Sequence, residues 1–158
     1  MGFEYRTHQE LCGLISGINE KFYKPASENT IYLEELTGEN TIAYIIALRD
    51  AYSHLVKIFE FHDIFTHDNR AKIERQLERY SGHLERLLFD TYHKIIDLKS
   101  NELWRIIPVK DKGAIQAQLA LEIKNQRVVD DGTTVDQKLE GYKKIIDLIE
   151  SIYKKFQG

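Results

Sequence analysis

Histidine and aspartate residues occur at two places where their spacing is compatible with a metal site. Asp90 and His93 lie three positions apart, the spacing of the carboxylate and histidine ligands on the helices of di-iron bundles. Such a centre needs the same pair on a second helix, and the sequence has no other pair of this kind. A second group lies in a polar connection and comprises His62, Asp63, His67 and Asp68. Because such residues are typical of turns and helix caps, we expect no metal and no cofactor.

The motifs that identify most enzyme classes are missing from the sequence. It contains no glycine-rich phosphate loop, no cysteine pair, no HExxH and no G-x-S-x-G. Cys12 is the only cysteine, so an internal disulfide is impossible and a reducing compartment fits best.

Two arginines are each followed by a histidine at a similar distance. Arg49 precedes His54 by five positions, with the polar Asp50 directly after the arginine, and Arg86 precedes His93 by seven. These segments resemble the Arg-x4–6-His motif of HEPN domains, helical bundles of which many are metal-independent ribonucleases or RNA-binding halves of toxin pairs. The resemblance implies a histidine that acts as general base on a ribose 2′-hydroxyl. It also implies an arginine that stabilises the charged phosphorane, in a cleft shared by two subunits.

Helix geometry separates the two pairs. Residues seven apart point the same way, whereas residues five apart diverge by about 140 degrees on a straight helix. His93 therefore has the better geometry, but Leu87 follows Arg86 where the family has a polar residue. The same histidines also fit ordinary surface or core positions, so both interpretations stay open.

The composition predicts one globular helical domain over residues 1–158. With 42% hydrophobic and 30% charged residues, a chain of this length can bury a substantial core. Two prolines and nine glycines leave little material for linkers or for a β-rich fold with many tight turns.

Charge and hydropathy restrict the partners that we expect. The net charge is −3, and positive charge is not concentrated along the chain as it is in most phosphate-binding proteins. Nucleic acid is therefore expected only if the protein is a ribonuclease or an RNA-binding protein. No stretch approaches the roughly 18 apolar residues of a membrane span, and no basic segment followed by an apolar run begins the chain. We expect a cytoplasmic protein that makes no membrane contact.

Residues 68–98 predict a long helix around which the others are organised. This stretch has no proline, and at about 1.5 Å per residue it would be on the order of 45 Å long. Its apolar positions recur at steps of three and four. They are Ile73, Leu77, Tyr80, Leu84, Leu88, Thr91, Ile95 and Leu98.

Four further helices complete an expected all-α, up-and-down bundle of about five helices. Their expected ranges are 3–23, 41–61, 112–126 and 134–156. We expect Pro25 to end the first helix, followed by a connector over 24–40 that is either all loop or holds a short helix around 31–35. Asn40 or Thr41 is expected to cap the second helix. Residues 100–108 either extend the long helix or bend away from it, and 130–132 form a break.

The last helix has the clearest start and the most regular apolar stripe. Thr133 with Asp136, and Thr134 with Gln137, both resemble a capping box. The stripe steps four, three, four, three, four, three and predicts packing along the whole helix. Its members are Val135, Leu139, Tyr142, Ile146, Ile149, Tyr153 and Phe156.

The second helix is apolar in nearly every direction around its axis between Ile42 and Phe59. A helix that is apolar on most sides is buried on most sides. We therefore expect it to be either the central helix of the bundle or a surface that pairs with a second chain.

Two functions follow from these observations. The first is a non-catalytic, homodimeric helical module that acts through protein contacts. The alternative is a HEPN-like, metal-independent ribonuclease or an RNA-binding toxin or defence protein. Its candidate catalytic residues are Arg86, His93, Arg49 and His54.

Overall fold

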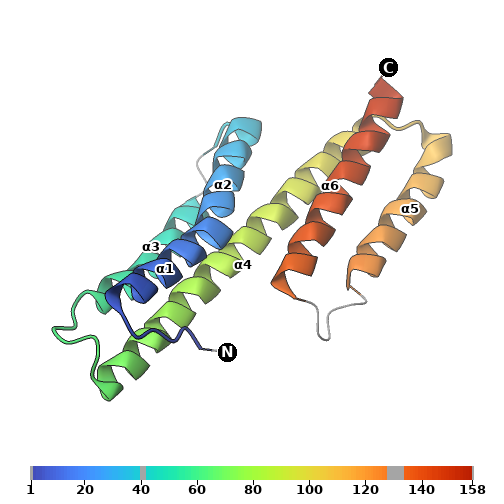
Figure 1. Cartoon of the computed structure of the whole chain (residues 1–158). Helices are drawn as coiled ribbons and strands as arrows, with labels where there is room; N and C mark the ends of the chain where they lie inside the picture. Colours follow the sequence, from blue (N-terminus) through green and yellow to red (C-terminus); the bar gives the residue numbers. More distant parts are fainter. Residues whose placement is uncertain (1, 40–41, 128–133, 158) are drawn as a thin grey trace. The chain divides into compact units, whose positions relative to one another are not determined.

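The fold is all-α in the computed structural model, which describes residues 2–39, 42–127 and 134–157. Helices form five rods in these ranges, which contain no strand (Figure 1). The expected up-and-down bundle with one long helix is confirmed. Asn40, Thr41, Thr133 and residues 130–132 lie outside the described residues.

The first rod comprises α1 (His8–Ile18), the π-helical segment η1 (Asn19–Tyr23) and α2 (Lys24–Thr37). It is followed by α3 (Ile42–Ile58) and by the long helix α4 (His67–Ile106). The last two rods are α5 (Val109–Arg127) and α6 (Val135–Gln157). Residues 100–106 therefore extend the long helix, and Pro108 lies in the short turn before α5.

The chain divides into two compact units, Met1–Thr91 and Tyr92–Gly158. The boundary falls inside α4, so that each unit contains part of this helix together with two other rods. The sequence prediction of one domain over residues 1–158 stays a prediction.

The expected end of the first helix at Pro25 is wrong, because the rod continues to Thr37. The η1 segment explains how the proline is tolerated: its hydrogen bonds reach back five residues, as from Lys24 N–H to the Asn19 carbonyl. A π turn widens the backbone, and this relieves the clash between a proline ring and the carbonyl four residues earlier. The rod ends at Gly38, whose φ of 68° is left-handed and whose N–H bonds the Glu34 carbonyl at 2.8 Å.

Unit 1 packs the first rod, α3 and the beginning of α4 around one core. The predicted stripe of α4 supplies much of this core, because its members from Ile73 to Thr91 are all buried. The first rod contributes Leu11, Ile18, Phe22, Ala26 and Leu33. Tyr80 also binds the first rod, since its hydroxyl donates to Asn19 Oδ1 at 2.6 Å.

The expectation that the second helix is central to the bundle is wrong. Only Ala51 and Ile58 of α3 are buried. The helix lies at the edge of unit 1 with a large part of its apolar surface exposed. Two neighbouring helices are not enough to cover a side-chain set that spans so much of its circumference.

Unit 2 consists of the end of α4, with α5 and α6. Its core contains Leu103 and Ile107 from the end of α4 and the loop after it, and residues from α5 and α6. The α5 and α6 members are Ile115, Leu119, Ile145, Ile149 and Ile152. Trp104 and Ile123 pack against this core from the side.

The start of α6 confirms one of the predicted capping boxes. The Gln137 N–H donates to Thr134 Oγ1 at 3.2 Å, and the Thr134 N–H donates to Gln137 Oε1 at 2.9 Å. The predicted stripe is displaced, however: of its members only Ile149 is fully buried, and the line of buried residues runs through Gly141, Ile145, Ile149 and Ile152.

Candidate functional site

The most distinctive surface of the protein is an exposed apolar stripe on the outer side of α3. It contains Ile42, Ile45, Tyr52 and Val56 and continues to Phe59 in the turn after the helix. Ile42 is 67% exposed, and Phe59 is 73% exposed. Ile46 borders the stripe and is exposed as well. We call the stripe, with Arg49 in its middle, the outer stripe of α3.

The exposure of these side chains has a free-energy cost. Full burial of one large apolar side chain contributes about 1.5–3 kcal/mol. Six such side chains, each about half exposed, therefore forgo on the order of 5 kcal/mol of burial free energy. Exposed apolar surfaces of this kind are more common at protein interfaces than on the rest of a protein surface.

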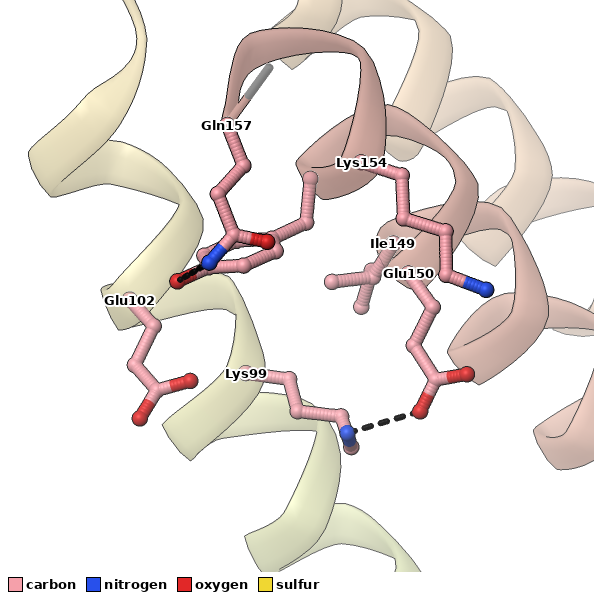
Figure 2. Close-up of a pocket in the computed structure, with 7 residues that line it drawn as sticks. Lys99, Glu102, Ile149, Glu150, Lys154 and Gln157 are labelled. Atoms are coloured by element: carbon pink, nitrogen blue, oxygen red, sulfur yellow. Dashed lines mark hydrogen bonds and ion pairs between the residues drawn. The ribbon is translucent and has the colours of Figure 1, made fainter.

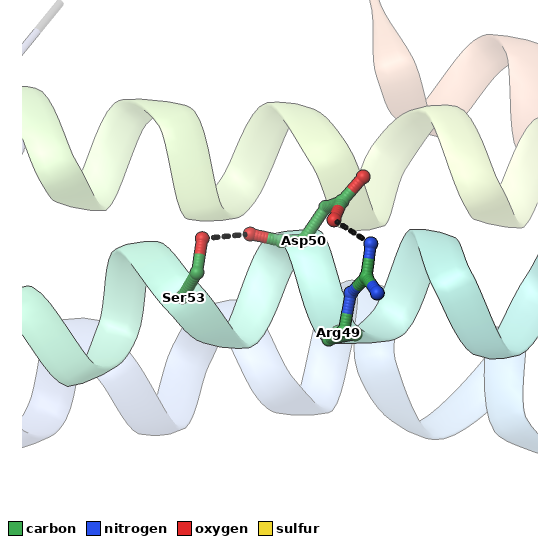
Figure 3. A network of polar contacts seen from close by, with 3 residues as sticks. All are labelled: Arg49, Asp50 and Ser53. Atoms are coloured by element: carbon green, nitrogen blue, oxygen red, sulfur yellow. Dashed lines mark hydrogen bonds and ion pairs between the residues drawn. The ribbon is translucent and has the colours of Figure 1, made fainter.

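Arg49 is the one charged residue of the outer stripe. Its side chain is 74% exposed, and its Nη2 lies 3.2 Å from Asp50 Oδ1 (Figure 3). Ser53 donates to the Asp50 carbonyl at 2.7 Å in the same network. The guanidinium is thus held at the surface of α3 by a neighbour on its own helix.

His54 lies on a different side of α3 and faces α4. Its Nδ1 is 2.8 Å from Gln76 Oε1, and its ring stacks on His83 at 5.1 Å between centroids with an interplanar angle of 17°. Because an amide oxygen can only accept, the His54 Nδ1–H donates in this bond.

The charges of Arg86 and Asp50 act on His83 as well. Burial lowers the pKa of His83 most, the neighbouring His54 and Arg86 lower it further, and Asp50 opposes them. The residues linked in this way are Asp50 and His54 from α3 with Gln76, His83 and Arg86 from α4. We call them the histidine cluster.

The structure groups the residues that the sequence singled out differently from the predicted pairs. It does not bring Arg49 and His54 together, since they lie on different sides of α3. It places His54 and Arg86, members of two different predicted pairs, around the same histidine. His83 was missed because no motif contains it. The only signal for His83 in the sequence is that it lies seven residues after Gln76, and therefore on the same face of α4.

His93, the fourth predicted residue, lies in unit 2. Its Nε2 is 2.7 Å from the Tyr142 hydroxyl, and its ring packs edge-on against that of Tyr142. The Tyr142 ring also stacks on Tyr92 at 5.5 Å. These contacts join the end of α4 to α6 and give His93 a packing role.

A pocket of about 290 Å³ lies between α4 and α6 in unit 2 (Figure 2). Lys99 and Glu102 line it from α4, and Glu150 and Lys154 line it from α6. Lys99 Nζ lies 2.8 Å from Glu150 Oε1. With two lysines and two glutamates, the lining favours neither an anion nor a cation.

Within the described ranges, no three His, Cys, Asp or Glu side chains gather in a way that could hold a metal ion. None of the helices there has both the length and the apolar character that crossing a membrane demands. No protein-family model matches the sequence, and comparisons with curated proteins and with solved structures likewise give no match.

Proposed function

We propose that this protein is a homodimeric assembly module without catalytic activity of its own and that it acts through the outer stripe of α3. The observation that carries the proposal is the exposure of four apolar side chains along one line of α3 and of Phe59 in the turn after it, with Ile46 beside them. Their burial in a complex supplies a driving force that the isolated chain does not use.

Size-exclusion chromatography with light scattering at micromolar concentration tests this proposal. We expect a dimer for the native chain. Ile45→Glu should give a monomer, because it would place a carboxylate in the middle of an apolar contact. A native chain that is monomeric and recruits no partner would remove the main support for the proposal.

A matched control is available in unit 2. Leu121 on α5 is 59% exposed, close to the exposure of Ile45, but it does not belong to the outer stripe. Leu121→Glu should leave the dimer intact. Loss of the dimer in both variants would mean that added charge, and not the position on α3, decides the result.

A second candidate function, a HEPN-like metal-independent ribonuclease, is favoured by the histidine cluster. Cleavage of a phosphodiester by general acid–base catalysis needs a neutral histidine as base, a proton donor and a cation for the phosphorane. Burial, with His54 and Arg86, lowers the pKa of His83 and so favours the neutral form that a base requires. His54 would supply the proton to the 5′-oxygen, and Arg86 would stabilise the phosphorane.

Cleavage of single-stranded RNA in the presence of EDTA tests this second candidate. His54→Ala, His83→Ala and Arg86→Ala should abolish cleavage without a change in circular dichroism, whereas His62→Ala, in an exposed loop position, should not. If His93→Ala abolished cleavage and His83→Ala did not, the site would be the predicted Arg86–His93 motif instead. Intact RNA after long incubation would rule out both sites.

A further inference from the structure

We infer that the outer stripe of α3 pairs with the outer stripe of a second copy, with the two helices antiparallel. The inference rests on the proposed assembly function and adds the partner, the orientation and the register. The stripe consists of Ile42, Ile45, Arg49, Tyr52, Val56 and Phe59.

The spacing of the stripe is self-complementary. Its members are separated by three, four, three, four and three positions, so that the pattern is the same when read from either end. A two-fold axis perpendicular to the helix, through the middle of the stripe, therefore places each large side chain of one copy opposite a large side chain of the other. The alternation of three and four is the spacing with which two helices interdigitate along a shared seam.

Antiparallel pairing gives every member of the stripe a suitable partner. Ile42 faces Phe59 of the second copy, and Ile45 faces its Val56. Arg49 faces Tyr52 of the second copy, where a guanidinium over an aromatic ring is favourable. The single charge of the stripe thus meets the one residue of the stripe that has an aromatic face and a polar end.

Parallel pairing lacks this match. It would place Arg49 opposite Arg49 in the middle of the seam, where two like charges would repel each other and lose water. Arg49 therefore disfavours parallel pairing, whereas in antiparallel pairing it faces the aromatic ring of Tyr52. A stripe that bound an unrelated partner would not need side chains that match one another across a two-fold axis.

Disulfide trapping tests both orientation and register. Cys12 is the only cysteine and is exposed, so Cys12→Ser provides a background without thiols. In this background we would prepare Ile45→Cys with an affinity tag and Val56→Cys without one, and oxidise each alone and in a mixture. The mixture should give a disulfide between tagged and untagged chains, and each variant alone should stay largely reduced, since only facing residues bring their Cα atoms within about 7 Å.

The outcomes separate this inference from the proposed function. A dimer in light scattering with 45–45 and 56–56 disulfides would overturn the antiparallel pairing and leave the assembly function standing. Equal yields of all three disulfides would mean that no single register exists and would also overturn the inference. A monomer without disulfides would overturn both. If either cysteine variant fails to fold, Ile42→Cys with Phe59→Cys repeats the test at the two ends of the stripe.

Discussion

Tyr80 links the middle of α4 to the π turn of the first rod. Burial, together with the neighbouring Tyr52 and Tyr23, raises its pKa to about 12, and its hydroxyl donates to Asn19 Oδ1. Tyr80→Phe should lower the free energy of unfolding by about 1–2 kcal/mol, because it leaves the Asn19 side chain without this donor. Urea denaturation of the two proteins measures the difference. An unchanged midpoint would show that water replaces the tyrosine without loss.

The same tyrosine predicts the behaviour of the protein in alkali. Its folded-state pKa lies above the unfolded value of about 10, so the folded state holds the proton more strongly. The contribution of Tyr80 to the free energy of unfolding is complete below pH 10 and is lost as the pH rises from 10 towards 12. Thermal unfolding across this range should show a steeper loss of stability in the native chain than in Tyr80→Phe.

His83 predicts the opposite dependence in mild acid. Its pKa is lowered in the folded state, mainly by burial and then by His54 and Arg86, so the unfolded chain binds a proton more readily. The contribution of neutral His83 to the free energy of unfolding is therefore complete above the unfolded pKa of about 6.5 and falls as the pH drops below it. His83→Gln should reduce this acid-side loss in chemical denaturation at successive pH values. Loss of equal size in both proteins would assign it to another group.

At the scale of the helices, two glycines have opposite roles. Gly38 ends the first rod with a φ of 68°, whereas Gly82 lies inside α4, where an added Cβ would meet nothing within 4 Å. Gly38→Ala should destabilise the protein by about 1 kcal/mol. Gly82→Ala should stabilise it by about 0.5–1 kcal/mol, since glycine disfavours a helix interior. Calorimetry should therefore show shifts of opposite sign, and a common sign would contradict the assigned conformations.

The capping box of α6 is a second determinant at this scale. Thr134→Ala removes the acceptor for the Gln137 N–H and should cost about 1 kcal/mol. Because the bond is local, Thr134→Ser should restore most of the stability. Hydrogen exchange should show faster opening of the first turn of α6 in the alanine variant, with the centre of that helix much less affected.

At the scale of the whole molecule, the proposed dimer would make the stability of the protein depend on its concentration. If folded chains associate and unfolded chains do not, the Tm rises with protein concentration by mass action. Over about a hundredfold range of concentration, the native chain should show this rise, and Val56→Glu should show none. A native Tm that is independent of concentration would count against the dimer.

The sequence predicted the helical fold and the main core stripe because both depend on local periodicity. The apolar positions of α4 from Ile73 to Ile95 recur every three or four residues, and a helix necessarily places them on one face, whatever packs against it. The capping box at Thr134 is equally local. The Pro25 prediction failed although it also used a local rule, because the π turn before it removes the clash on which that rule depends.

The candidate sites could be predicted only in part, because they depend on which helices are neighbours. His54 and Arg86 were singled out, but His83 joins them only because α3 and α4 pack with opposite chain directions. The breadth of the apolar surface on α3 was also plain in the sequence. Whether that surface forms the centre or the edge of unit 1 depends on how many other helices cover it.

The sequence by itself therefore determined the helices, most of their limits and the main line of residues that α4 buries, from Ile73 to Ile95, since these follow from interactions between residues a few positions apart. The tertiary structure alone decided that the outer stripe of α3 is exposed, that His54 stacks on His83 and that the charge of Arg86 acts on His83. Both outcomes depend on contacts between helices distant in the sequence, and the periodicity of one helix carries no information about the position of another.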